Sequence, residues 1–483
     1  MIRSLFAIIP LVRLLPIIFL SYSLILAKGQ ERTTPVEGIR SNDSRLHALM
    51  GGVVVSSKGD LKANIILRDG RIDLVEENAM APEGARVWDM KGKRIYPGFI
   101  EPWLEGDLTE EFRGSHWNKK VMPDRKTASL MTIDEDKLNM MRGMGFCVAH
   151  AVPKNGIFRG KSALFLLRDG ARDVQLLSSS AGQVLDFDHG GGGYPSSLMG
   201  SLALVRQTLS DSNWYHEAMA AHLKEPSSVT RPAHSRALSE LKLSDKFLFI
   251  ARDELDYGRI KKLKDEFQLN ILVRGNGYEY RRVDLLKELG CDVIVPLNFP
   301  ALPSIDDPAK ALDYSLEQLQ HWELAPSGPA LVSTGGLRIS LSSYGLDDPL
   351  KSFWERLRTA VKRGMDPNDA LRSLTSIPAK ALGIDDRCGD LMPGKLANLV
   401  ISEGDLFLDD QSKVYATWVD GIPYLKELSP AEDISGRWEI SGFESKEPIV
   451  WEIPEGTDIK VKYGEDKKFS GKWKLGRLLL FPP

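Results

Sequence analysis

One stretch of the sequence decides the fold, and it reads Arg94-Ile-Tyr-Pro-Gly-Phe-Ile-Glu-Pro-Trp-Leu-Glu105. Ile95 to Ile100 is an apolar run that only Pro97-Gly98 interrupts, so the pattern predicts one short buried strand. Three acidic or aromatic side chains follow at alternate positions, Glu101, Trp103 and Glu105. The carboxyl ends of barrel strands carry functional groups, so we look for a site directly after this strand.

The composition is that of a globular protein. The chain has 483 residues, of which 42% are hydrophobic and 27% charged, and its formal net charge is -3. This length allows one large barrel domain and a smaller one. No cluster of Lys and Arg suggests a nucleic-acid partner. The three cysteines, Cys147, Cys291 and Cys388, predict no disulfide framework, and we expect them to behave as small buried hydrophobes.

The first 27 residues predict export. Arg3 precedes apolar runs that continue to Ala27, a small residue suited to cleavage, so residues 1–27 have the pattern of a signal peptide. An uncleaved membrane anchor is the alternative. We therefore expect a periplasmic or secreted protein, membrane-anchored if the segment is retained. The polar residues 28–45 predict a linker.

Short β patterns occur near both ends of the chain. Apolar runs occupy Val53–Val55, Ala63–Leu67 and Ile72–Val75, and Asp69-Gly70 predicts a hairpin turn between the last two. Similar runs return at Leu399–Ile401 and Val414–Val419. Because the first group is too small to bury a core, we predict one small β-sandwich built from residues 46–96 and 379–429.

The segment between them alternates strand-like and helix-like patterns. Strands are predicted at Phe146–Ala149, Ser162–Leu167, Val174–Leu177, Phe247–Ile250, Ile271–Val273, Val293–Pro296 and Ala330–Val332. Helices are predicted at Asp134–Gly143, Met199–Leu223, Leu255–Phe267, Arg282–Leu289, Leu316–Leu324 and after Asp348. This alternation predicts an α/β fold, a (β/α)8 TIM-like barrel over residues 97–378. An open doubly wound sheet is the alternative.

The last part of the chain changes pattern again. Gly436–Ile440, Ile449–Ile453, Thr457–Tyr463 and Leu475–Phe481 alternate or run apolar between turn residues, which predicts strands. Residues 430–483 therefore have the pattern of a β-rich connector that lacks some of its strands.

Several phrases resemble the opening and closing signatures of the amidohydrolase superfamily. These are Pro97-Gly-Phe-Ile-Glu101, Thr375-Ser-Ile-Pro-Ala-Lys-Ala-Leu-Gly383 and Gly389-Asp-Leu-Met-Pro-Gly-Lys-Leu-Ala-Asn-Leu-Val400. The resemblance implies a TIM barrel with a composite β-sandwich. It also implies hydrolysis of non-peptide C–N bonds, in which one or two zinc-like ions activate water.

The chain departs from the family pattern at each expected metal ligand. Trp103 and Glu105 stand where the family has two His, and Arg274 follows a later strand where another His is expected. Thr334 follows the run predicted as the last strand, in place of the family's Asp. We therefore expect no metal or other cofactor in this chain.

Other residues form a pool of substitutes, and the pool comprises Glu101, Glu105, His116, His150, Asp186, Asp188 and His189. Alternative zinc ligands are Glu105, His150 and His189. Each has a structural interpretation as well, because a single His at a strand end commonly packs, and Gly190–Gly193 is typical of a flexible loop. The candidate binding residues at the barrel mouth are Glu101, Trp103, Glu105, His150, His189, Arg274 and Thr334.

Narrower phrases resemble the degenerate first unit of exported tandem amidohydrolases; they are Trp117-Asn-Lys-Lys-Val-Met-Pro-Asp124, Gly156-Ile-Phe-Arg-Gly160 and Pro296-Leu-Asn-Phe-Pro300. This resemblance implies a catalytically silent unit that supports a second amidohydrolase unit on a following or separate chain. Two alternatives stay open. One is an active hydrolase of cyclic amide-type molecules with unorthodox ligands, and the other is an exported small-molecule-binding module with Arg274 as an anion clamp.

Overall fold

The computed structural model describes residues 45–56, 59–107, 109, 112–190, 192–303 and 313–425, together with the backbone of five later strands. The predicted signal peptide, residues 1–27, and nearly all of the predicted linker lie outside these residues. The chain divides into two compact units, Met1–Tyr424 and Leu425–Pro483. No helix among the described residues is long and apolar enough to cross a membrane.

The second unit contains one antiparallel sheet in which each strand pairs with the next along the chain. Its strands are β17 (Gly436–Ile440), β18 (Ile449–Ile453), β19 (Asp458–Tyr463), β20 (Lys467–Lys474) and β21 (Arg477–Phe481). The strand β20 was not among the sequence predictions. Whether further chain completes this sheet stays a prediction.

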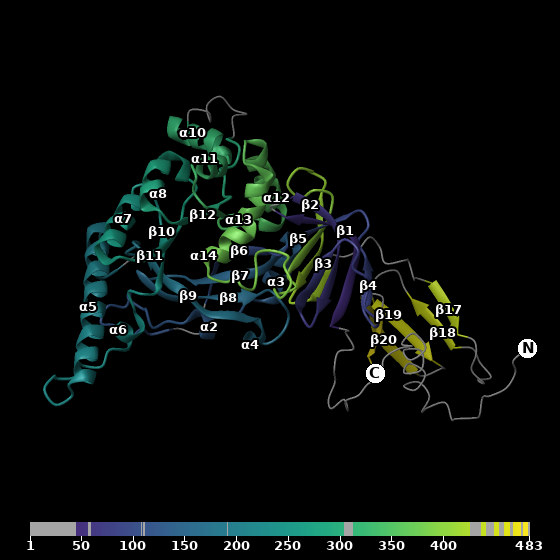
Figure 1. Cartoon of the computed structure of the whole chain (residues 1–483), viewed down its shortest axis with the longest axis horizontal. Helices are drawn as coiled ribbons and strands as arrows, with labels where there is room; N and C mark the ends of the chain where they lie inside the picture. The colour runs from purple at the N-terminus through teal and green to yellow at the C-terminus, as the bar shows by residue number, and fades with distance from the viewer. Residues whose placement is uncertain are drawn as a thin grey trace, which may run out of the picture. The chain divides into compact units, whose positions relative to one another are not determined.

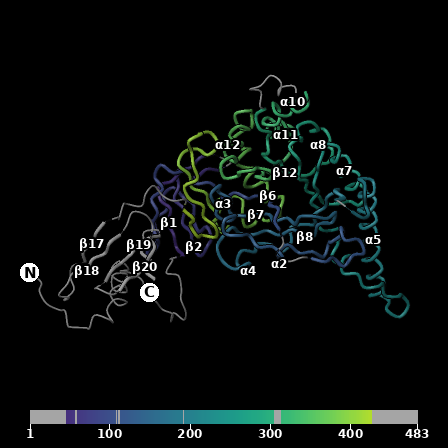
Figure 2. Tube along the Cα trace, turned by 180° about the vertical axis from the view of Figure 1, so that it is seen from behind, coloured from purple at the N-terminus to yellow at the C-terminus, as the bar shows by residue number. Residues whose placement is uncertain are grey.

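The first unit contains a sheet that joins both ends of its chain. Its strands are β1 (Leu46–Ser56), β2 (Gly59–Arg68), β3 (Arg71–Glu76), β4 (Arg86–Asp89), β5 (Lys93–Pro97), β14 (Leu399–Glu403), β15 (Lys413–Val419) and β16 (Ile422–Leu425). The order is β16-β15-β14-β5-β1-β2-β3, with β4 paired to β1. Figure 2 shows the early and late strands side by side. We call this the composite sheet; its description as a two-layered sandwich stays a prediction.

The second sheet of this unit is the barrel sheet, with the order β13-β12-β11-β10-β9-β8-β7-β6. Its strands are β6 (Phe99–Gly106), β7 (Phe146–Pro153), β8 (Phe158–Leu166), β9 (Leu176–Asp186), β10 (Lys246–Ile250), β11 (Asn270–Arg274), β12 (Asp292–Pro296) and β13 (Ile339–Ser342). Most are buried on both faces, as expected for a sheet covered by helices. The sheet forms a nearly closed barrel.

The prediction of eight parallel strands was wrong for β8. This strand pairs antiparallel with both β7 and β9, whereas the other neighbours in the sheet pair in parallel. The connection from β7 to β8 is a short turn at Lys154–Ile157. A turn of that length permits only antiparallel pairing, because parallel strands require a longer crossover.

The prediction of one strand over Ile95–Ile100 was also wrong. The strand β5 ends at Pro97 in the composite sheet, and β6 begins at Phe99 in the barrel sheet. Gly98 lies between them and donates its N–H to Asn398 O at 2.8 Å. A Cβ atom on Gly98 would lie 2.5 Å from Cys147 Sγ, so the close approach of these segments requires glycine.

Helices lie on the outer side of the barrel strands (Figure 1). They are α2 (Thr127–Leu130), α3 (Glu135–Met144), α4 (Arg172–Gln175), α5 (Leu198–Lys224), α6 (Arg236–Glu240), α7 (Asp256–Phe267), η2 (Glu279–Arg282), α8 (Val283–Leu289), α10 (Leu316–Leu324), η3 (Ala325–Ser327), α11 (Gly328–Thr334), α12 (Pro349–Lys362), α13 (Pro367–Leu374) and α14 (Ser376–Ala381). Polar caps define several N-termini: Asp134 accepts from Lys137 N, and Asp348 from Lys351 N. Apolar faces then pack on the strands.

Two predicted strands are helical. Ala330–Val332 lies inside α11, where Pro329 occupies the first helical turn and favours the helix. The last barrel strand is instead Ile339–Ser342, a short run that periodicity did not single out. Val174 belongs to the helical turn α4, and β9 begins only at Leu176.

Candidate functional site

The site is built on the barrel mouth, which we define as the rim formed by the C-terminal ends of the parallel barrel strands. The pairing register places Asp186 beside Ile250, and Ile250 beside Arg274. The antiparallel β8 contributes its first residues to the same rim, because Phe158 pairs with Leu185 near the end of β9. Side chains from distant parts of the sequence therefore meet at this edge.

Glu101 connects the two edges of the barrel sheet. Its buried carboxylate accepts hydrogen bonds from Ser342 Oγ at 2.5 Å, Ser343 N at 2.9 Å and Ser343 Oγ at 2.7 Å. It also accepts from Trp103 N at 3.1 Å. Burial raises the pKa of this carboxyl, and the hydrogen bonds oppose that effect without cancelling it. Glu101 is thus fully engaged in joining β6 to the end of β13.

Trp103 and His150 fill the centre of the mouth. Trp103 is 1% exposed, and its indole Nε1 donates to Glu105 Oε1 at 3.3 Å. The His150 ring lies edge-on to it, with 6.1 Å between the ring centroids. His150 Nδ1 lies 2.7 Å from Pro102 O, and a carbonyl only accepts, so Nδ1 carries the proton. Nε2 has no hydrogen-bond partner in the part of the chain that the structure describes.

Burial lowers the pKa of His150 to about 4. The ring is therefore neutral near pH 7, and its Nε2 is a hydrogen-bond acceptor.

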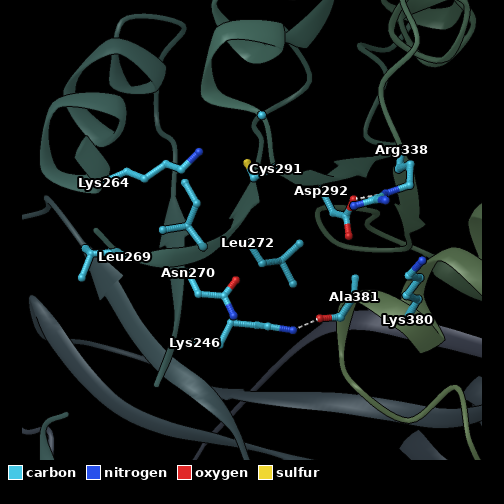
Figure 3. A pocket seen from close by; sticks show the side chains of 12 residues that line it. Lys246, Lys264, Leu269, Asn270, Leu272, Cys291, Asp292, Arg338, Lys380 and Ala381 are labelled. Carbon is cyan, nitrogen blue, oxygen red and sulfur yellow. Dashed lines mark hydrogen bonds and ion pairs between the residues drawn. The ribbon is translucent and has the colours of Figure 1, made fainter. Parts of the chain in front are cut away.

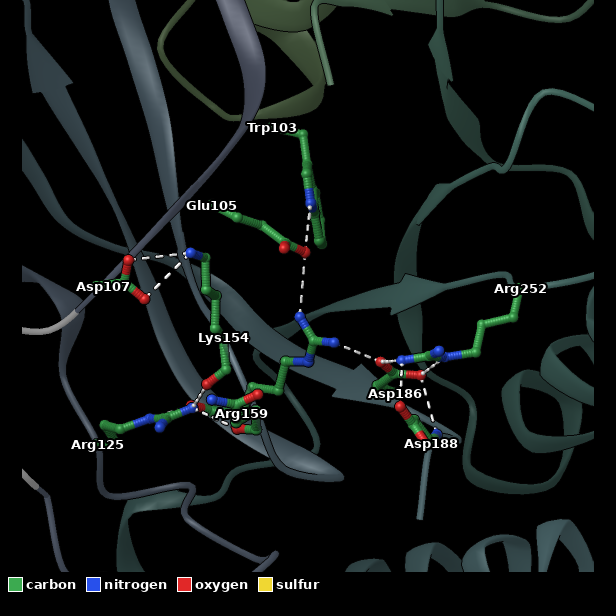
Figure 4. A network of polar contacts seen from close by, with 10 residues as sticks. Trp103, Glu105, Asp107, Arg125, Lys154, Arg159, Asp186, Asp188 and Arg252 are labelled. Atoms are coloured by element: carbon green, nitrogen blue, oxygen red, sulfur yellow. Dashed lines mark hydrogen bonds and ion pairs between the residues drawn. The ribbon is translucent and has the colours of Figure 1, made fainter. Parts of the chain in front are cut away.

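A chain of guanidinium and carboxylate groups crosses the mouth (Figure 4). Arg159 donates to Glu105 Oε1 at 3.1 Å and to Asp186 Oδ2 at 2.5 Å. Arg252 binds both oxygens of Asp186, at 2.8 and 2.7 Å, and also pairs with Asp188 at 2.7 Å. Burial alone would raise the pKa of Asp186, but the two arginines outweigh burial and the pKa falls.

Arg274 does not take part in this network of guanidinium and carboxylate groups. Its guanidinium carbon lies 4.3 Å from the centroid of the Tyr344 ring and 5.5 Å from that of Trp103. The residue is 8% exposed, and among the described residues its guanidinium has no hydrogen bond or ion pair. Both rings lie within the distance at which a cation is attracted to an aromatic ring.

The structure brings together most of the candidate residues. Glu101, Trp103, Glu105, His150 and Arg274 lie at the mouth, as do Asp186 and Asp188 from the wider pool. The backbone oxygen of His189 accepts from Lys120 Nζ, and its Nδ1 lies 2.8 Å from Gly190 O in the loop after β9. His116 Nδ1 accepts from Asn118 N within the loop after β6.

The placement of Thr334 at the mouth was wrong. Thr334 ends α11, its hydroxyl donates to Ala330 O at 2.8 Å, and its side chain is exposed. It precedes β13 instead of following it, so it belongs to the opposite end of the barrel. Ser342 and Ser343 occupy the end of the last strand.

A family model for the amidohydrolase family matches residues 330–424. This segment contains the last barrel strand and the return to the composite sheet, and it agrees with the fold of the whole first unit. The matched residues and the barrel fold make this chain similar to amidohydrolases.

One solved structure of an amidohydrolase shares the fold, and others are similar over most of the chain. The structure of an amidohydrolase from Thermotoga maritima is 22% identical, covers 78% of this chain and 100% of its own, and has a TM-score of 0.66. A prolidase complexed with N-methylphosphonate-L-proline is 13% identical over 79% of this chain and 100% of its own, with a TM-score of 0.47. Molinate hydrolase is 15% identical over 79% and 95%, with a TM-score of 0.45. No curated protein matches the sequence.

The side chains described at the barrel mouth do not fit a catalytic metal ion. Among the described residues, no three His, Cys, Asp or Glu side chains lie together in a way that could hold one. The acids that are present are taken: Glu105 and Asp186 bind arginines, and Glu101 binds serines. Zinc sites need neutral imidazole, thiolate or free carboxylate ligands, and His150 is the single imidazole in contact with this cluster.

Sequence reasoning missed Arg159 and Arg252, which dominate the site. Arg252 follows the predicted strand Phe247–Ile250 by two residues, so its position at the strand end was an available signal. Arg159 gave no such signal, because it begins a strand instead of ending one. Only the reversed direction of β8 carries it to the mouth.

A separate cavity of about 240 Å³ lies at the opposite end of the barrel (Figure 3). Four lysine and arginine side chains line it, and three of them, Lys246, Lys264 and Arg338, have structural partners. Lys246 Nζ donates to Ala381 O at the end of α14, and Lys264 Nζ donates to Leu289 O at the end of α8. Arg338 pairs with Asp292 at 2.5 Å. These cations cap helix C-termini and neutralise an acid.

Proposed function

We propose that this chain is a catalytically silent amidohydrolase unit that supports a second amidohydrolase unit. One observation carries the proposal: Arg159 and Arg252 occupy the carboxylates at the place where the superfamily uses a metal ion. The similarity to amidohydrolases supports amidohydrolase chemistry as the general chemistry of this fold. The silence of this unit is the finer statement that requires a test.

Electrostatics favour the silent state. Two like unit charges 4 Å apart repel by about 4 kcal/mol at an effective dielectric constant of about 20, and a divalent ion doubles this value. A metal ion at this mouth would either displace Arg159 from Asp186 or lie near Arg274. Displacement would leave a buried guanidinium without its partner, which costs about 3–5 kcal/mol.

Metal analysis of the full chain tests this proposal. The purified protein is dialysed against zinc without chelator, and its zinc is counted by elemental mass spectrometry. We expect well below one zinc per chain, and the same content in His150→Asn and Glu105→Gln. His234→Asn, an exposed histidine, is the matched control for adventitious surface binding.

The opposite result supports the active hydrolase with unorthodox ligands. About one zinc per chain that is lost in His150→Asn or Glu105→Gln, but kept in His234→Asn, would overturn the silent unit. His150 Nε2 is the observation that favours this second function, because it is a buried acceptor without a partner.

The supporting role concerns a partner and needs a separate experiment. We propose that the protein works outside the cytoplasm, on the basis of the apolar pattern of residues 1–27. Isolation of the native protein, with N-terminal sequencing, should give a mature chain that begins near Lys28. A zinc-containing amidohydrolase unit should be present in equal amount, either continuous with this chain or bound to it. Recovery of this unit alone would contradict the supporting role.

A further inference from the structure

Arg274 is a buried cation whose hydrogen-bonding capacity is unused. The residue ends β11 and is 8% exposed, and its Nε has no acceptor. Within the part of the chain that the structure describes, no oxygen accepts from its guanidinium. Buried charged groups are normally hydrogen-bonded and paired, because desolvation without a partner is unfavourable.

Two acids near Arg274, Glu105 and Asp186, do not accept a hydrogen bond from it and instead accept from other residues. Glu105 Oε1 accepts from Arg159 and Trp103, and both oxygens of Asp186 accept from Arg159 and Arg252. These acids raise the pKa of Arg274 through space, against the larger lowering effect of burial. The charge of Arg274 is thus moderated at a distance, while its N–H groups are not satisfied.

Two aromatic rings lie close to the guanidinium of Arg274. Tyr344 and Trp103 lie against the guanidinium, with their ring centroids 4.3 and 5.5 Å from its carbon. Contacts with rings use the faces of a guanidinium, and the N–H donors lie along its edge. A planar carboxylate matches that edge by accepting two parallel hydrogen bonds.

His150, which also contacts Trp103, provides a second buried polar atom without a hydrogen-bond partner among the described residues. His150 Nε2 is fully buried and without a donor, and its ring contacts the Trp103 indole. Two polar groups without partners therefore border the same tryptophan, which is the arrangement expected of a binding site.

We propose that Arg274 anchors a binding site for a small carboxylate at the barrel mouth, with Trp103 and Tyr344 as its aromatic walls. The inference rests on the proposed function in one respect: without a metal ion, Arg274 is the group at the mouth that remains available to an anion. The cationic cavity at the other end of the barrel is not part of this site.

Calorimetric titration of the full chain with benzoate and acetate tests the inference. Benzamide and acetamide serve as neutral isosteres, and the ionic strength is kept constant with chloride. We expect saturable binding of a carboxylate, no binding of its amide, and a thermal midpoint about 1–3 °C higher at tenfold excess over Kd. No saturable binding of either carboxylate, or equal binding of the amides, would overturn the inference.

Three variants of the full chain locate the site. Arg274→Met keeps the apolar part of the side chain and should weaken binding more than tenfold. Arg274→Lys keeps the positive charge but lacks the paired N–H donors of the guanidinium, and it should weaken binding less. Arg281→Met removes an arginine that pairs with Glu317 at 2.8 Å and should bind as the unaltered chain does. Unchanged binding in Arg274→Met contradicts the assignment. If that variant does not fold, unchanged binding in Arg274→Lys and Tyr344→Leu contradicts it equally.

Zinc is measured in the same samples. Zinc uptake at about one per chain would count against the silent unit, whereas absence of both zinc and carboxylate binding would count against Arg274 alone.

Discussion

The carboxylate of Glu101 and the hydroxyl of Ser342 join the first barrel strand to the last, with 2.5 Å between Glu101 Oε1 and Ser342 Oγ. The hydrogen-bonded order of the sheet has β13 at one end and β6 at the other. The side chain of Glu101 therefore joins β6 to β13, the two strands at the ends of the hydrogen-bonded order. Two residues that are 241 positions apart thus complete the barrel.

Glu101→Gln should destabilise the protein although it is nearly isosteric. Each carboxylate oxygen accepts from a backbone N–H, one from Trp103 and the other from Ser343. The amide NH2 of glutamine must then face a donor in either orientation. We expect a loss of about 1–3 kcal/mol of unfolding free energy, measured by urea titration. Glu355→Gln, at an exposed position on α12, should leave the free energy of unfolding unchanged. An equal loss in both variants would contradict a stabilising role of Glu101 between β6 and β13.

His150 should make the protein sensitive to acid between about pH 6.5 and 4. The pKa of His150 in the folded protein is about 4, below the ordinary value of 6.5. The unfolded state therefore binds the proton first, so the stability from neutral His150 is present above pH 6.5 and is lost as the pH falls towards 4. The loss is at most about 3 kcal/mol.

Urea midpoints measured across this pH range test the effect of His150. His150→Asn should flatten the curve, because it removes the imidazole that takes up the proton. The variant should still fold, because the Asn side chain can donate to Pro102 O. His234→Asn should leave the curve as it is. If the two variants lose stability with falling pH in the same way, His150 is not the group responsible.

Lys246→Met should weaken the end of α14. Lys246 Nζ donates to Ala381 O, a carbonyl without a helical partner at the C-terminus of α14, and a cation there also complements the helix dipole. We expect a cost of about 1 kcal/mol in thermal or urea unfolding. Lys262→Met is the control, since Lys262 is an exposed lysine in the middle of α7 and far from the end of α14 in the sequence. Comparable costs in both variants would argue against capping.

Gly98→Ala should be far more damaging than Gly258→Ala. A Cβ atom at residue 98 would lie 2.5 Å from Cys147 Sγ and 2.8 Å from Asn398 Cβ, whereas at residue 258, in α7, it would meet nothing within 4 Å. We expect a cost of about 1–3 kcal/mol or more for Gly98→Ala and a gain of up to about 1 kcal/mol for Gly258→Ala. Thermal midpoints of the two variants compare them directly. Equal midpoints would mean that the contact at Gly98 relaxes without cost.

Long periodic elements were predictable from the sequence, and short or reversed ones were not. The apolar stripe after Asp348 gave α12, because a helix of that length repeats its pattern several times. Ile339–Ser342 is too short for its period to be distinguished, and α11 took its place in the prediction. At the site, Arg274 was found because it ends a strand, and Arg159 was missed because β8 runs backwards.

The single residue between β5 and β6 has a consequence for how this protein opens. Consecutive Cα atoms are about 3.8 Å apart, so neither sheet can move away from the other without withdrawing one of these two strands. Ile95 and Ile100 are buried in different sheets, yet their amides should be exposed by the same event. Amide hydrogen exchange should therefore give both residues a common protection factor, as members of one cooperative unit that includes both sheets.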